Sequence, residues 1–552
     1  MSFSLPLPAR HRTLPRCLSL RSATLGLSLC APLLLGACDL APPYAPPHFI
    51  VPDSWQGQAP FAIARPADAT LPTQWWKLFN DPLLDALESR ALAENGNLQA
   101  AGERFLQART MVTKARADLF PHVALTAGGS DNRQSDDRLF RPMTTATQVT
   151  DDYAGLASWE PDFWSAIRNR VRIRRQNAQE AAADFAMARL SLEAELASDY
   201  IQLRGYDAQL SIYNQSIAYY TKALKITKTQ MDYQAAPRLD YARAQAQLYT
   251  TQALKLDIEA ARQVTEHAIA VLVNAAPSTF SIPPVATLAF KQPHVPVGVP
   301  SGLLQRRPDI ASSERRMAQA NRAIGIARAA FYPHFSLSAD GGFEADGMKL
   351  ASLANSLWTY GARFNLPLFD GGLRRAELQR SWSGYRQTRD EYRVTVLNAF
   401  REVEDGLSRT NRLTLENTAL EKAVKANLET QNMTMTLYQG GAGTYLEAIF
   451  SQENTLQARI LQTMTATRMF QADVGLIRAL GGGWDVKDLP TMAQTLSMGP
   501  FQYKDLHHPR QVGDVRASEK PEQWENLTAP APDIAGLGSR SHLAPMPAGD
   551  LP

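Results

Sequence analysis

The sequence predicts a mixed α/β membrane protein in which a β-barrel, shared by several chains, continues into long helices. Two observations lead to this fold class. The segments ARADLFPHVALTAGG, from Ala115, and ARAAFYPHFSLSADG, from Ala327, are nearly the same, which indicates an internal two-fold repeat. Each copy also contains stretches of strict apolar–polar alternation, followed by a very long helical pattern.

The N-terminal segment has the pattern of a bacterial lipoprotein signal. Four arginines within residues 10–21 precede a short apolar run that ends in Leu-Gly-Ala-Cys at Cys38. Positive charges, a short apolar run and small residues at its end are typical of a secretory signal peptide, predicted here over residues 1–37. The last four residues resemble a lipobox, which implies cleavage before Cys38 and acylation of its thiol. The alternative is a signal peptide with an incidental cysteine.

The composition of the chain narrows the class of protein further. The chain is 45% hydrophobic and 20% charged with a net charge of +3, so no charge bias points to nucleic acid. After the signal, no apolar run is long enough for a transmembrane helix. Residues 38–80 are rich in proline and are expected to be extended. Residues 492–552 are rich in Pro, Ser and Gly and are expected to form a disordered tail.

The first repeat is predicted to begin with one amphipathic helix. Asn80 or Asp81 can cap it, and Pro82 suits its first turn. The helical pattern continues to Phe120-Pro121, where proline interrupts it.

Two strands follow in each repeat. Alternation marks strands in HVALTAGG (122–129), YAGLASWEPDF (153–163), HFSLSADGG (334–342) and LWTYGARFNLPLF (357–369), with polar loops near 131–150 and 343–355. The clearest is LWTYGARFNLPLF, in which Trp358, Tyr360 and Phe364 share one face. These three side chains are candidates for contact with outer-membrane lipid or for an aromatic girdle.

Long helical hairpins complete each repeat. The pattern predicts helices from about Ser165 to Tyr233 and from Leu373 to Tyr438, each with a return helix, to about residues 274 and 480. In the first of these helices, apolar positions recur every seven residues, which indicates coiled-coil packing over roughly 100 Å. The breaks QAAPRL and QGGAGT mark the hairpin turns. Heptad spacing favours packing over a substrate track for Tyr206, Tyr213 and Tyr220.

Four strands cannot close a barrel, and open sheet edges are not tolerated in lipid. Membrane barrels begin at eight strands, so several chains are expected to share one. The alternative of another class is a periplasmic coiled-coil structural lipoprotein with a small sheet.

Enzyme motifs are missing from the sequence. It has no Gly-x-Ser-x-Gly elbow and no Walker loop, and GGAGT follows a helix rather than a strand. His122 and His334 have no further ligands nearby in sequence, so each is read as a polar residue at a helix-to-strand corner. We therefore expect no enzymatic activity and no metal site.

Several motifs carry a family resemblance. GLLQRRPDIASSERRM from residue 302, LFDGGLRRAEL from residue 368 and ALGGGW from residue 479 resemble TolC-like outer-membrane efflux lipoproteins of the NodT type. The resemblance implies repeats at 81–300 and 301–491, and a homotrimer with a twelve-stranded barrel and a helical periplasmic tunnel. It implies an outer-membrane channel without cofactors that works with a periplasmic adaptor and an inner-membrane resistance-nodulation-division pump. A conduit for type I protein secretion is the alternative within this class.

The resemblance also suggests roles for the hairpin tips. Carried over by position, the candidate residues of a periplasmic gate are Tyr438, Gly441, Gly443, Glu447 and Asp240. For Glu447 and Asp240, the alternative is an ordinary acid in the first turn of a helix. The candidate residues for adaptor contact are Gln234, Pro237, Arg238, Gln439, Gly440 and Thr444.

Three features depart from the family pattern. Asp39 follows the lipid cysteine, a position at which Asp favours inner-membrane retention in enteric bacteria. Gln234 and Pro237 stand where relatives usually keep a glycine turn, whereas the second hairpin keeps Gly441. The proline-rich tail is not a family feature.

Overall fold

The computed structural model describes residues 38–47, 55, 71–133, 135, 137, 147–293, 295–296, 300–345, 352–492 and 494–495. The predicted signal peptide and almost all of the predicted C-terminal tail lie outside these residues. The chain divides into two compact units. One contains the described residues up to Pro43 with Arg116–Arg170 and Arg322–Ser381, and the other contains Tyr44–Ala115, Val171–Asn321 and the described residues from Trp382 onward.

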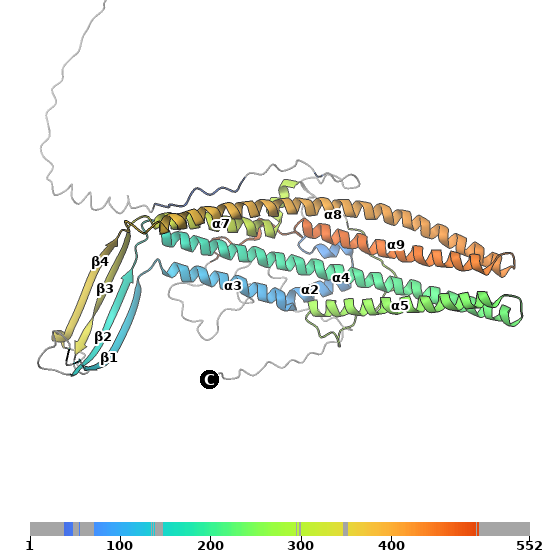
Figure 1. Ribbon diagram of the computed structural model, residues 1–552, viewed down its shortest axis with the longest axis horizontal. Coiled ribbons are helices and arrows are strands. Elements are labelled where there is room, and N and C mark those ends of the chain that lie inside the picture. Colours follow the sequence, from blue (N-terminus) through green and yellow to red (C-terminus); the bar gives the residue numbers. More distant parts are fainter. Residues whose placement is uncertain are drawn as a thin grey trace, which may run out of the picture. The chain divides into compact units, whose positions relative to one another are not determined.

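The four strands form one antiparallel sheet in the order β1-β2-β3-β4 (Figure 1). Their bounds are β1 His122–Arg133, β2 Thr147–Trp159, β3 His334–Ala345 and β4 Ser356–Asn365. Each repeat supplies one strand pair, so the prediction of two strands per repeat is confirmed. Within the described residues, β1 and β4 each pair on one side only.

One face of this sheet is apolar across all four strands. Leu125 pairs with Gly155, Gly155 with Gly341, and Gly341 with Trp358. Because directly paired residues share a face, Leu125 and Trp358 point to the same side. The same register places Val123 with Tyr360. The other face carries polar pairs such as Asp340 with Thr359.

Both strand-to-helix junctions use an aspartate to begin the next helix. Asp162 accepts hydrogen bonds from the backbone N–H groups of Ile167 (3.1 Å) and Arg168 (2.8 Å) at the start of α4, Ala166–Asp232. Asp370 accepts from the N–H groups of Gly372 (3.1 Å) and Arg374 (3.2 Å) at the start of α8, Leu373–Gln439. Free N–H groups at a helix N-terminus need acceptors of this kind.

The long helices end where the sequence predicts. α4 and α8 have 67 residues each, and their return helices are α5 (Arg238–Leu272) and α9 (Tyr445–Ala479). Tyr213 and Tyr220 are buried in a cluster with Leu248 and Leu456, which confirms packing as their role. Among the described helices, none has an apolar window long enough to cross a membrane.

The predicted single entry helix is wrong, because the structure has two helices, α2 (Pro82–Glu94) and α3 (Gly96–Ala117). Asp81 caps α2 by accepting from the N–H groups of Leu83 (2.9 Å) and Leu84 (3.1 Å). Asn95 interrupts the pattern. Its side-chain oxygen accepts from the N–H of Leu98 (2.9 Å), and its amide donates to the carbonyl of Leu272 in α5 (2.9 Å).

The segment before the second strand pair forms α6 (Leu303–Arg306) and α7 (Pro308–Ala329). Short 3₁₀ turns lie at Trp75–Phe79, Pro300–Gly302, Leu353–Asn355 and Val486–Asp488. The largest hydrophobic cluster contains Trp75, Trp76 and Phe79 together with residues of α2, α4, α5, α8 and α9.

Candidate functional site

The two hairpin turns close with the same hydrogen-bond pattern. In the first, the N–H of Ala235 donates to the carbonyl of Gln230 (2.7 Å). In the second, the N–H of Ala442 donates to the carbonyl of Leu437 (2.9 Å). Both turns need a residue with positive φ, which is Gln234 (58°) in the first and Gly441 (75°) in the second. The first hairpin therefore makes a glycine-type turn without glycine.

The tips of the two hairpins are held together by a small cluster, which we call the tip cluster: Ala223, Ala244, Met435, Tyr438, Tyr445, Ala448 and Ile449. Tyr438 belongs to this cluster and is only 9% exposed. Its hydroxyl donates to the side-chain oxygen of Gln230 in α4 (2.5 Å), and its ring lies 5.4 Å from that of Tyr445. Burial, and then the charge of Asp240, raise the pKa of Tyr438, so the hydroxyl stays protonated and can donate.

The acidic gate candidates have partners within the chain. Glu447 and Thr444 form a capping box at the start of α9: the N–H of Glu447 donates to the Thr444 hydroxyl (3.3 Å), and the N–H of Thr444 donates to the Glu447 carboxylate (3.2 Å). Asp240 lies in the first turn of α5 and is 3.6 Å from Arg243. Gly443 lies against the backbone of Tyr438: a Cβ added to Gly443 would be 3.3 Å from the backbone nitrogen of Tyr438.

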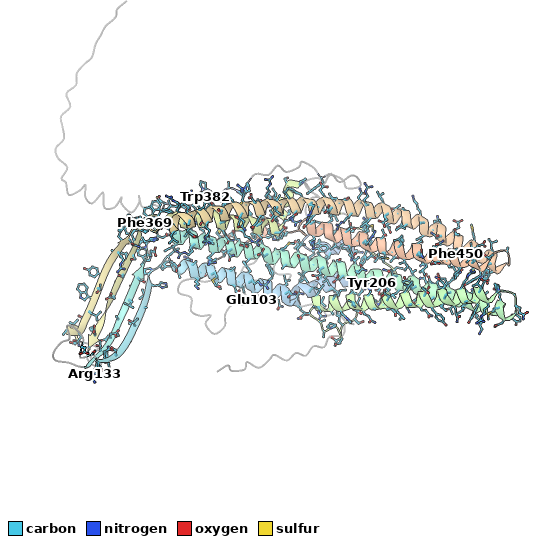
Figure 2. The ribbon with its side chains drawn as sticks, viewed as in Figure 1. Glu103, Arg133, Tyr206, Phe369, Trp382 and Phe450 are labelled. Atoms are coloured by element: carbon cyan, nitrogen blue, oxygen red, sulfur yellow. The ribbon has the colours of Figure 1, made fainter. Side chains whose placement is uncertain are left out.

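The candidates for adaptor contact are solvent-exposed. All six lie at or beside the turns: Gln234, Pro237, Arg238, Gln439, Gly440 and Thr444. Figure 2 shows Phe450 near the same end of α9, and its side chain is 55% exposed. The tips thus present exposed residues, both polar and apolar, beside the buried Tyr438.

The aromatic residues of β4 are exposed in the single chain. Trp358 is 70% exposed, Tyr360 76% and Phe364 58%. The rings of Trp358 and Tyr360 stack at 5.6 Å. Cys38 is also exposed.

The motif before α7 contains a buried arginine whose role the sequence analysis missed. Arg307 donates to Asp309 (2.7 Å), to Glu402 of α8 (2.8 Å) and to the carbonyl of Ala479 at the end of α9 (2.9 Å). An added Cβ at Gly481 would lie 1.9 Å from the carbonyl oxygen of Arg306. The Arg-Arg-Pro-Asp and Gly-Gly-Gly motifs therefore form one structural joint. Two adjacent arginines before Pro-Asp were its only signal in the sequence.

The duplicated strand pairs and the two long hairpins define a TolC-like fold, as is found in outer-membrane channels. The family model described as "Outer membrane efflux protein" matches residues 87–275 and 299–482. The chain belongs to this family, and it is an outer-membrane efflux channel rather than an enzyme.

Individual relatives agree with this assignment. The chain is 31% identical over 467 residues to the pyoverdine export outer membrane protein OpmQ of Pseudomonas aeruginosa, which covers 82% of this chain and 95% of that protein. It is 28% identical to Nodulation protein T of Rhizobium leguminosarum, and the match covers 82% of this chain and 96% of that protein. The solved structure of the outer-membrane channel OprN superposes with a TM-score of 0.73 at 27% identity. The superposition covers 81% of this chain and 100% of that one. The predicted resemblance is confirmed.

Proposed function

We propose that three copies of this chain form the outer-membrane duct of a tripartite efflux pump. The three sheets close into one twelve-stranded barrel, and the hairpins of the three chains form a tunnel in the periplasm. The partners are a periplasmic adaptor and an inner-membrane pump of the resistance-nodulation-division class. The similarity to OpmQ, a pyoverdine export protein, supports efflux of small compounds over protein secretion.

The observation that carries this proposal is the sheet itself. Among the described residues, its edge strands β1 and β4 each pair on one side only, and one face is continuously apolar from Val123 to Tyr360. Lipid tolerates such a face but not such edges, so β1 of one chain must pair with β4 of the next. Closure by three sheets gives an even number of strands within the range of bacterial barrels.

The trimer is tested by cross-linking the full chain in detergent, followed by native mass spectrometry. We expect one species with three times the mass of a mature chain. A stable monomer that stays in solution without detergent would favour the coiled-coil structural lipoprotein.

We also propose that Cys38 carries the lipid. Its exposure leaves room for acyl chains, each buried methylene of which contributes about 0.8 kcal/mol of membrane binding. Cells are labelled with an alkyne fatty acid, and Cys38→Ser is compared with the parent. Label is expected on the parent alone, and label on the serine variant would exclude this site.

The gate is proposed to depend on the tip cluster more than on a ring of acids. Tyr438 joins α8 to α4 through Gln230, whereas Glu447 caps its own helix. Opening the tips by separating the two hairpins must break the Tyr438 contact, and it leaves the capping box intact.

Single-channel recording separates the two gate mechanisms. Tyr438→Phe removes the hydroxyl and keeps the ring, so the closed state should open several-fold more often. Glu447→Gln keeps a side-chain oxygen for capping and removes the charge, so its closed-state conductance and cation block should equal those of the parent. If Glu447→Gln changes cation block and Tyr438→Phe changes nothing, the acidic ring is the gate.

A further inference from the structure

The residues that follow Cys38 are bound against the helices beside the sheet. The carboxylate of Asp39 accepts a hydrogen bond from the side-chain amide of Asn169 in α4 (2.9 Å). It also forms an ion pair with Arg322 of α7 (3.0 Å). Asn169 is fully buried, so Asp39 binds an amide group that is shielded from solvent.

Two further contacts fix the next residues. Arg328 donates to the carbonyl of Leu40 (3.1 Å), and the N–H of Ala41 donates back to Asp39 (3.1 Å). An added Cβ at Gly325 would lie only 2.8 Å from Cβ of Ala41. Arg322, Gly325 and Arg328 are spaced three residues apart, so they share one side of α7. That side of α7 forms the binding surface, here called the receptor, for residues 39–41.

We propose that Asp39 is a positioning residue that latches the lipid-bearing end of the chain to α4 and α7. The inference rests on the proposed acylation of Cys38. Asn169 lies ten residues after the end of β2, and Arg328 lies six residues before the start of β3. At about 1.5 Å per helical residue, the latch is within a few turns of the sheet. It therefore holds the acyl chains at a fixed point near the membrane boundary.

The latch also explains the aspartate after the cysteine. A carboxylate can accept from the buried amide and pair with the arginine at the same time. Serine, which has one short hydroxyl, cannot bridge both. In this chain we assign Asp39 to binding the protein's own helices, rather than to a sorting signal alone.

The latch is tested in the full chain purified from membranes, with a nitroxide spin label at Leu40→Cys. Leu40 contacts the receptor through its backbone carbonyl, so the substitution keeps the contact. The acylated Cys38 does not react, so one label per chain is expected. We expect an immobilised spectrum, whose immobilised fraction falls at least twofold in Asp39→Ser, in Arg322→Gln and in Gly325→Val.

The matched control is Arg316→Gln. Arg316 is on the same helix and pairs with Glu180 rather than with the segment after Cys38, so its spectrum should equal that of the parent. The double variant Asp39→Lys with Arg322→Glu restores the ion pair but not the acceptor for the Asn169 amide, so it should recover part of the immobilisation that Arg322→Glu alone loses. A mobile label in the parent, or an immobilised label that Asp39→Ser and Arg322→Gln leave unchanged, overturns the latch.

The number of labels per chain and membrane fractionation distinguish the latch from acylation of Cys38 and from membrane sorting. Two labels per chain would show a free Cys38 thiol, which contradicts acylation and leaves the spectrum at residue 40 to judge the latch. Membrane fractionation is done in parallel. If Asp39→Ser moves the protein between membranes while the label stays immobilised, Asp39 acts only in sorting.

Discussion

Gly205 of α4 lies directly against Thr467 of α9. A Cβ at this position would be 2.4 Å from the Thr467 hydroxyl oxygen and 2.9 Å from its methyl group. Glycine is unfavourable within a helix, so its presence here reflects the close approach of the two helices. Gly475 of α9 has nothing within 4 Å of an added Cβ.

We predict opposite effects for alanine at these two glycines. Gly205→Ala forces α4 and α9 apart and should lower the free energy of unfolding by about 1–3 kcal/mol. Gly475→Ala should leave it unchanged or raise it by up to about 1 kcal/mol, because alanine favours the helix. Thermal melting of the purified protein checks both, and equal melting temperatures would contradict the close approach.

Asp473 is a buried carboxylate between helices, only 1% exposed. Burial raises its pKa to about 7, and Thr410 of α8 opposes the shift. One carboxylate oxygen has no hydrogen-bond partner among the described residues. A carboxyl whose pKa is raised on folding stabilises the protein when it is protonated, and this stability is lost as pH rises from about 4 to 7.

The prediction for Asp473→Asn therefore depends on pH. At pH 8 the free energy of unfolding of the variant should exceed that of the parent by up to about 4 kcal/mol, and this difference should shrink toward pH 5. The parent should melt at a lower temperature at pH 8 than at pH 5. Asp232→Asn, at an exposed aspartate of α4, is the control. An equal gain at both pH values would exclude titration of Asp473 as the cause.

At the scale of elements, α2 and α3 differ from the single helix that the sequence predicts. The apolar periodicity continues through Asn95, so the local pattern contains little sign of a break. Asn95 is 5% exposed, and its two side-chain hydrogen bonds join the start of α3 to the end of α5. The break depends on a residue 177 positions away, which periodicity cannot report.

Asn95→Ala is predicted to lower the free energy of unfolding by about 1–3 kcal/mol, because it removes a cap and leaves the partly buried carbonyl of Leu272 without its donor. Asn95→Ser keeps an oxygen for the cap and should cost less. Asn97→Ala, at an exposed asparagine of the same first turn, should be within about 0.5 kcal/mol of the parent. Equal melting of the variants at positions 95 and 97 would contradict a role for the break.

At the scale of the whole molecule, the two faces of the sheet differ in polarity. Figure 2 shows Arg133 and Phe369 at opposite ends of the strands, so a polar and an aromatic side chain mark the two ends. Between them, Trp358 lies on the apolar face and Thr359 on the opposite one. In a closed barrel, these two neighbours would face lipid and lumen.

Arginine at either position should therefore have unequal effects. Trp358→Arg is predicted to destabilise the inserted barrel by about 2–4 kcal/mol if it lies near the lipid midplane. Thr359→Arg should insert normally and change only conductance. Refolding into lipid vesicles, followed by denaturant titration, measures both. A larger loss for Thr359→Arg would place lipid on the other face.

The sequence by itself determined the elements with strong local signals. The helix predicted from Ser165 to Tyr233 is observed as Ala166–Asp232, because the heptad pattern is long and a proline follows the turn. Strand alternation likewise fixed which residues of β4 share a face, since successive side chains point to opposite sides. The motifs determined the family, which the comparisons confirm.

Only the tertiary structure decided what the motif residues contact. It placed Tyr438 against Gln230, 208 positions away, and Asp39 against Asn169 and Arg322. It also showed that Arg307, just before α7, joins the middle of α8 at Glu402 to the end of α9 at Ala479. Periodicity and capping signals act over a few residues, whereas these contacts arise when distant helices pack. Their partners are therefore not specified by any local pattern.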